Sequence, residues 1–204
     1  NEVRLFGASE LHLITELFVG DFSEHLLGII DEANCVIHVG TSCFSNYNTY
    51  VCINLNTVLL PSVKYVNDYA FYGCASLINT NFDSLITAYN YSFYSCTALL
   101  GFNAPIATSF GEYCFSNCTS IITVTAPSLL AAGSYCFSYT TSSTHYSFPS
   151  LTECGSSCFE MMYDTDLTNI NLPVATIIGS RSFYGCFALN TINIPLCTQL
   201  GPDN

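Results

Sequence analysis

One phenylalanine recurs at a nearly constant spacing, and this repeat constrains the fold more than any other feature of the chain. It occupies Phe44, Phe71, Phe93, Phe115, Phe137, Phe159 and Phe183, and four of the six steps are 22 residues. Proline, glycine, tyrosine and cysteine recur with the same period. Because one period governs several residue types, the chain is predicted to be a stack of similar units, each contacting its neighbours.

Each unit is predicted to hold one short strand followed by turns. Residues 191–194 alternate polar and apolar side chains, as a strand with one buried face does. A proline then ends the strand, because it has no N–H for the ladder. In the next segment Phe93, Cys96 and Leu99 have the i, i+3, i+6 spacing of a short helical turn.

A unit of this size cannot bury both of its faces, so its neighbours must complete the core. We expect at least seven stacked coils over residues 34–201, with a parallel sheet built from the segments before each proline. The repeated phenylalanines should form one buried stack with Leu77, Leu99, Leu167 and Leu189.

The motif itself resembles a known family. Residues 70–77 read AFYGCASL and residues 181–195 read RSFYGCFALNTINIP. They resemble the BspA-like leucine-rich repeat (LRR) family, whose hallmark is A-F-x-x-C-x-x-L followed by I-x-I-P and I-G. The resemblance covers about residues 34–201. It implies an α/β repeat fold: a right-handed solenoid with one parallel β-sheet and short helical or turn segments on the opposite side.

The same resemblance implies a setting and a role. Members are surface proteins of bacteria, protozoa and phages that serve in adhesion and binding. The resemblance implies no catalytic residue in this chain, since the motif positions are structural.

The two ends of the chain differ from the repeat. Residues 1–33 are predicted to be a non-repeat N-terminal cap or docking segment, and residues 34–204 a solenoid of about seven 22-residue coils. A helix capped by Ser9 would place four apolar side chains on one face: Leu11, Ile14, Leu17 and Phe18. At the other end, Leu196 and Leu200 would lie at an open strand edge, which we expect another copy or further chain to cover.

Composition excludes several classes of protein. Only three residues are Lys or Arg, against 15 acids, and the net charge is −12. Such a chain cannot neutralise a phosphate backbone, so no nucleic acid is expected as partner. No membrane insertion is expected either, because no run reaches the roughly 18 apolar residues of a membrane span. The four histidines lie in no motif for a nucleophile, base or metal, so we expect no enzyme, no cofactor and no metal.

Twelve cysteines leave two interpretations open. Those in register, such as Cys96 and Cys118, are favoured as small buried thiols. Cross-coil disulfides are also geometrically feasible, because stacked coils lie about 5 Å apart. The better disulfide candidates are off register: Cys35, Cys52, Cys154 and Cys197.

Tyrosines and amides are predicted to form a surface stripe. Tyrosines two residues before the phenylalanine should stack as a ladder: Tyr69, Tyr91, Tyr113 and Tyr135. Strand positions should add hydrogen-bonding groups on the sheet: Asn103, Thr125, Ser147, Asn171 and Asn193. The ladder is either packing between coils or a contact stripe, since tyrosine suits interfaces. Asn90 and Asn117 match the N-glycosylation sequon.

These observations favour a non-catalytic extracellular repeat protein for adhesion or for protein or glycan binding, on a cell or virion surface. The alternative is a structural subunit of an end-to-end filament or larger surface assembly. The expected partners are other copies of the chain, in a homo-oligomer, or a surface glycan or protein.

Overall fold

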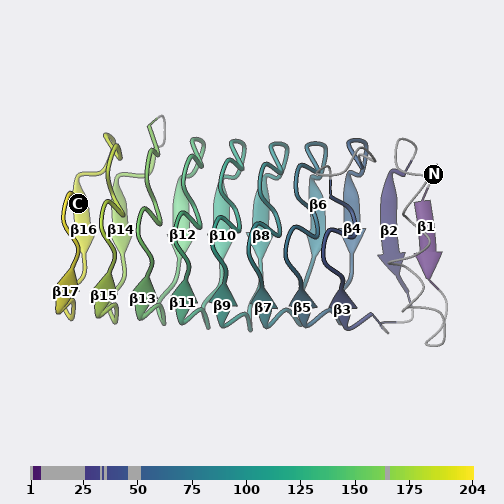
Figure 1. Cartoon of the computed structure of the whole chain (residues 1–204), viewed down its shortest axis with the longest axis horizontal. Helices are drawn as coiled ribbons and strands as arrows, with labels where there is room; N and C mark the ends of the chain where they lie inside the picture. The colour runs from purple at the N-terminus through teal and green to yellow at the C-terminus, as the bar shows by residue number, and fades with distance from the viewer. Residues whose placement is uncertain (1, 6–25, 33, 35, 46–51, 164–165) are drawn as a thin grey trace.

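The chain winds into an elongated stack of coils, with β1 and β17 at its two ends (Figure 1). The computed structural model describes all residues except 1, 6–25, 33, 35, 46–51 and 164–165. Along the stack the strands follow their order in the sequence (Figure 1). Among the described residues, each strand therefore pairs with strands of the adjacent coils, as the 22-residue repeat predicts.

Each coil of the repeat contributes a strand of three residues and then a strand of two. The longer strands, with two four-residue strands at the N-terminal end, are β1 (Glu2–Leu5), β2 (Gly28–Asp31), β4 (Thr57–Leu59), β6 (Asn79–Asn81), β8 (Gly101–Asn103), β10 (Thr123–Thr125), β12 (His145–Ser147), β14 (Asn169–Asn171) and β16 (Thr191–Asn193). The two-residue strands are β3 (His38–Val39), β5 (Tyr65–Val66), β7 (Thr87–Ala88), β9 (Ser109–Phe110), β11 (Ala131–Ala132), β13 (Glu153–Cys154), β15 (Ile177–Ile178) and β17 (Gln199–Leu200).

Every pairing between these strands is parallel and joins the same position of successive coils. The longer strands form three groups, in the orders β1-β2-β4-β6, β8-β10-β12 and β14-β16. The two-residue strands form one continuous eight-stranded sheet. The predicted parallel pairing before each proline is thus confirmed, but these strands form three sheets and not the single one expected, and a further continuous parallel sheet lies on the segment after each proline. That further sheet was not expected, because two residues are too few to show an alternating pattern.

The predicted short helical segments were wrong: the described residues contain no helix. The segment is a run of tight turns, in which Tyr94 N–H donates to the Tyr91 carbonyl and Cys96 N–H to the Phe93 carbonyl. The N–H groups of Tyr91, Phe93 and Ser95 donate instead to the next coil. Tyr91 and Ser95 have positive φ, of 56° each, which a right-handed helix does not allow. Consecutive turns thus reproduce the i, i+3 spacing of a helix without its hydrogen bonds.

The core is a continuous stack of phenylalanine rings, as predicted. Neighbouring rings from Phe44 to Phe183 lie 5.2–5.7 Å apart with interplanar angles of 16° or less. Leu77, Leu99 and Leu167 are buried beside them, whereas Leu189 is only partly buried.

The cysteines of the described residues are free thiols, including Cys52, Cys154 and Cys197. Cys35 lies outside the described residues. The thiol of Cys96 donates to the Phe71 carbonyl and that of Cys118 to the Phe93 carbonyl, at 3.3 and 3.1 Å. Burial raises the pKa of Cys96 well above its ordinary value, which keeps this thiol protonated as a donor at neutral pH. These register cysteines act as small core residues that tie one coil to the next.

The N-terminal segment adds β1 and β2 to the sheet of β4 and β6. Its four predicted assembly residues, Leu11, Ile14, Leu17 and Phe18, lie outside the described residues. The boundary between residues 33 and 34 stays a prediction.

Candidate ligand-binding face of the tyrosine rows

The repeated tyrosines before each phenylalanine stack as the sequence predicts. We call Tyr69, Tyr91, Tyr113 and Tyr135 the first tyrosine row. Their ring centroids lie 4.8, 4.7 and 4.6 Å apart along the row, and the rings are parallel within 9°. All four side chains are half-buried, so the row forms part of the outer surface of the solenoid.

Backbone geometry places this row. All four tyrosines have positive φ, between 53° and 58°, a conformation that costs an ordinary L-residue about 1 kcal/mol or more. The same register holds Ser157 and Arg181, also at positive φ. The turn therefore requires the conformation in every coil, and the choice of tyrosine at this position adds the ring stack.

A second tyrosine row runs beside the first, one residue after each phenylalanine, and it is interrupted. Tyr72 and Tyr94 stack at 4.9 Å, and Tyr94 tilts against Tyr91 at 5.7 Å. In the next two coils the same register holds Ser116 and Ser138. Two rings are therefore absent from the second row where the first row continues through Tyr113 and Tyr135.

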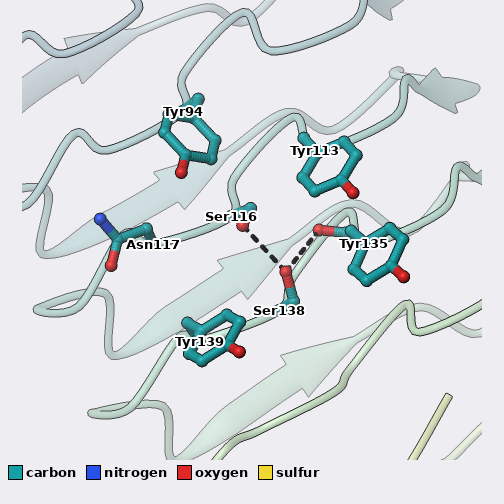
Figure 2. A pocket seen from close by; sticks show the side chains of 7 residues that line it. All are labelled: Tyr94, Tyr113, Ser116, Asn117, Tyr135, Ser138 and Tyr139. Atoms are coloured by element: carbon teal, nitrogen blue, oxygen red, sulfur yellow. Dashed lines mark hydrogen bonds between the residues drawn. The ribbon is translucent and has the colours of Figure 1, made fainter. Parts of the chain in front are cut away.

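The interruption opens a hollow of about 440 Å³. Its lining comes from three registers of the turn segment: Tyr94, Tyr113, Ser116, Asn117, Tyr135, Ser138 and Tyr139. In Figure 2 the two serines lie in the middle, Tyr94 and Tyr139 lie at opposite ends, and Asn117 faces Tyr113 and Tyr135 across the serines. We call this site the serine hollow.

Hydrogen bonds fix the two serines. The Ser138 hydroxyl donates to the Tyr135 carbonyl at 3.0 Å, and the two hydroxyl oxygens lie 2.8 Å apart (Figure 2). Since Ser138 has given its one hydrogen to the carbonyl, Ser116 is the donor in the pair. The Ser116 oxygen therefore presents its lone pairs. Asn117 donates from Nδ2 to Ser95 Oγ at 2.8 Å, which holds its amide at the rim.

The site is uncharged at neutral pH. Burial raises the pKa of Tyr113 above its ordinary value, and Tyr135 and Glu112 raise it further. Burial also raises the pKa of Tyr139, with Tyr163 and Glu160 adding to the effect. These hydroxyls consequently stay protonated well above pH 7 and can donate hydrogen bonds.

The second row continues beyond the hollow with a salt bridge. Glu160 is the next residue of the register; it is buried and accepts from Arg181 Nη2 at 2.9 Å. The Arg181 guanidinium lies 4.4 Å from the ring centroid of Tyr184. The charge of Glu160 is therefore paired with that of Arg181.

The polar strand row predicted beside the tyrosines is present but lies elsewhere on the coil. Asn103, Thr125 and Ser147 are register partners in β8, β10 and β12. Asn171 and Asn193 pair in β14 and β16, where Asn193 Nδ2 donates to Asn171 Oδ1 at 2.7 Å. These residues belong to the three-residue strands, whereas the tyrosines belong to the turn segment, so the two rows occupy different segments of each coil.

The remaining predicted site residues occupy varied places. Asn90 is exposed, and its Oδ1 accepts from the Glu112 N–H at 2.9 Å. Asn117 is half-buried in the serine hollow. Leu196 and Leu200 are exposed on the last coil, with 55% and 56% of their surface accessible.

Sequence reasoning missed Ser116, Ser138 and Tyr139 as site residues. The signal was present in the repeat, since the register after each phenylalanine reads Ser45, Tyr72, Tyr94, Ser116, Ser138, Glu160 and Tyr184. The two successive serines after Tyr94 mark the hollow once that register is known to lie beside another tyrosine row.

In the part of the chain that the structure describes, no helix could cross a membrane. No group of three or more His, Cys, Asp or Glu residues there is arranged to hold a metal ion.

Parallel strands at one register, a buried phenylalanine and leucine stack, and coils of about 22 residues define a leucine-rich-repeat solenoid. A family model for the BspA type leucine rich repeat region matches residues 21–128 and 102–203, with six copies. The chain belongs to this BspA-type leucine-rich repeat family.

Solved structures with the same fold come from bacteria. A leucine-rich repeat protein of T. pallidum is 22% identical, with a TM-score of 0.63 over 80% of this chain and 78% of that one. A leucine rich cell surface protein of Faecalibacterium prausnitzii is 26% identical, with a TM-score of 0.58 over 84% of this chain. The chain spans 40% of the length of that second protein. A search of curated proteins found no match.

Proposed function

We propose that this solenoid is a non-catalytic, extracellular binding module that serves in adhesion on the surface of a cell or virion. The proposal rests on one observation, the continuous half-exposed first tyrosine row with the serine hollow beside it. Tyrosine offers a large, rigid contact area with a hydroxyl at the rim, at small cost in side-chain entropy. Family membership and the similar cell surface protein of Faecalibacterium prausnitzii support a role in binding.

The chemistry of the face indicates the kind of ligand. It combines aromatic rings, hydroxyls and an amide, and the chain carries a net charge of −12. A neutral polar ligand, such as a glycan or the polar surface of a protein, suits this face better than an anionic one.

The test is an adhesion assay with coated beads. Beads carrying the 1–204 chain should adhere to host-cell or bacterial surfaces, and Tyr91→Asn should reduce adhesion at least fivefold. Asparagine tolerates positive φ, so the backbone is kept while the ring is lost. Asn193→Thr on the strand row is the control and should adhere as the unmodified chain does. Equal adhesion by the two variants and the unmodified chain would exclude the tyrosine face.

End-to-end assembly is the second candidate function. The last coil exposes Phe187, Leu196 and Leu200, with 81%, 55% and 56% of their surface accessible. A second copy that stacked there would bury these side chains and pair with the edges of β16 and β17. Light scattering over a concentration series tests it: growth that Leu196→Asp and Leu200→Asp abolish supports assembly, whereas a constant monomer mass excludes it.

A further inference from the structure

We propose that the serine hollow is a saccharide-binding site that takes one neutral hexopyranose unit of a glycan. This inference rests on the proposed binding function and assigns its ligand class.

The end of the second tyrosine row supplies a flat apolar surface. Tyr94 has one face stacked on Tyr72 at 4.9 Å, with an interplanar angle of 12°. Its register continues into Ser116, which carries no ring, so the stack ends there. Tyr94 lines the hollow and meets Tyr113 in a T-shaped contact at 6.5 Å. The C–H face of a pyranose chair packs against an aromatic face, and a sugar would thus continue the stack where the third ring is absent.

The side of the hollow is made of ring edges. Tyr113 is stacked between Tyr91 and Tyr135, at 4.7 and 4.6 Å, so both of its faces are covered. It therefore presents C–H edge to the hollow. Ring edges are the positive part of the aromatic quadrupole and suit the oxygen atoms of a sugar.

The lining carries no Lys or Arg, and the chain has a net charge of −12, which argues against sialylated or sulfated sugars. The proposal therefore commits to a neutral sugar.

The base and the rim supply hydrogen bonds of the right kind. Ser116 Oγ donates to Ser138 and keeps its lone pairs for a sugar hydroxyl. Asn117 uses Nδ2 for Ser95, which leaves its Oδ1 as an acceptor at the rim. Apolar faces with a few convergent polar groups are typical of sites that bind small polar molecules.

The chain offers its own blocking variant. In Ser116→Tyr the new ring takes the register of Tyr72 and Tyr94, where the same turn already holds a tyrosine. The flanking residues Tyr113 and Asn117 have the same positive φ as Tyr91 and Ser95. The substitution should therefore fold and fill the hollow. Tyr184→Ser is the matched control, since it makes the reverse change in the same register, outside the lining.

The experiment uses the full 1–204 chain on an array of neutral, sialylated and sulfated glycans. Saturation-transfer NMR with methyl glucoside, galactoside, mannoside and N-acetylglucosamine then follows. We expect binding to neutral hexose-terminated glycans, saturation of sugar C–H protons, and at least a tenfold loss of affinity in Ser116→Tyr but not in Tyr184→Ser. If Ser116→Tyr does not fold, Tyr94→Leu should give the same loss.

Each other outcome overturns the assignment. Glycan binding that Ser116→Tyr and Tyr94→Leu leave unchanged places the site elsewhere, and the proposed binding function then stands on its own. Binding restricted to sialylated or sulfated glycans refutes the neutral ligand. Absence of glycan binding refutes the saccharide site, and adhesion lost in Tyr91→Asn would then show that the face binds protein instead.

Discussion

The phenylalanine stack makes a quantitative prediction at Phe115. This ring is fully buried and stacked between Phe93 and Phe137 at 5.3 and 5.7 Å. It also meets Phe102 and Phe110 edge to face, at 4.6 and 5.1 Å. Four aromatic partners surround a single side chain in the middle of the solenoid.

Replacing Phe115 by alanine should cost about 3–5 kcal/mol, which is the usual range for a buried phenylalanine. The upper half of that range is expected because aromatic pairs add about 0.5–1.5 kcal/mol each beyond area burial. A domain is commonly stable by only about 5–15 kcal/mol. In a solenoid stabilised by nearest neighbours the loss falls on the adjacent coils, so the variant should unfold in two steps rather than one.

Urea denaturation followed by far-UV circular dichroism and tyrosine fluorescence measures the effect. Phe187→Ala is the control, because that ring is 81% exposed and its loss should change the free energy of unfolding by less than about 0.5 kcal/mol. If Phe115→Ala costs no more than Phe187→Ala, the stacked rings do not stabilise the solenoid and the reasoning is refuted.

Three further predictions follow from other contacts. Gly155→Ala should destabilise by about 1–3 kcal/mol, since its Cβ would lie 2.4 Å from Ser134 N in the adjacent coil; an unchanged melting temperature would contradict this. Stability should fall as pH rises above about 10, because burial raises the folded-state pKa of Tyr146, which is hydrogen-bonded to Thr140 and Ser143, above its unfolded value. The contribution of Tyr146 is full below the unfolded pKa and is lost progressively as pH rises from there through the folded-state pKa. Urea titrations at pH 8 to 11 should show a weaker fall in Tyr146→Phe. An alkylating reagent at pH 8 should modify the partly exposed Cys197 in the native chain but reach the buried Cys96 and Cys118 only in urea; native labelling of those two thiols would argue against the packed core.

The coil stack was predictable because one period places equivalent residues beside each other. Once Phe93 and Phe115 are one repeat apart, stacking of coils brings their rings together. The parallel strands follow for the same reason. The helical turn was not predictable in its true form, since Phe93, Cys96 and Leu99 have one spacing in a helix and in consecutive turns. The positive φ of Tyr91 and Ser95 and their hydrogen bonds to the next coil distinguish the two. In the register of Ser95 only Gly73 and Gly185 mark that conformation by a glycine.

Of the candidate site, the sequence predicted the first tyrosine row but not the serine hollow. The first tyrosine row follows from the period alone, and its stacking at 4.6–4.8 Å is confirmed. The serine hollow depends on two registers lying side by side, which only the turn geometry determines. Tyr91 and Tyr94 are three residues apart, and their rings meet at 5.7 Å because the turn between them reverses the chain. Without that contact Ser116 and Ser138 appear as ordinary polar positions.

Some registers of the repeat keep the same kind of residue in every coil, whereas the register of Tyr94 and Ser116 varies. Inward registers hold Phe, Leu or Cys because each must fill the space between two neighbouring coils, and Cys118 and Cys96 even repeat the same hydrogen bond. The register after each phenylalanine faces no such demand, because a tyrosine fits at position 94 and a serine at 116 on the same turn. Ser116 and Ser138 carry no rings, although the stacked pair Tyr72 and Tyr94 shows that this register accommodates a ring stack. Packing does not require that loss, and in the proposed saccharide site a sugar would take the place of the rings.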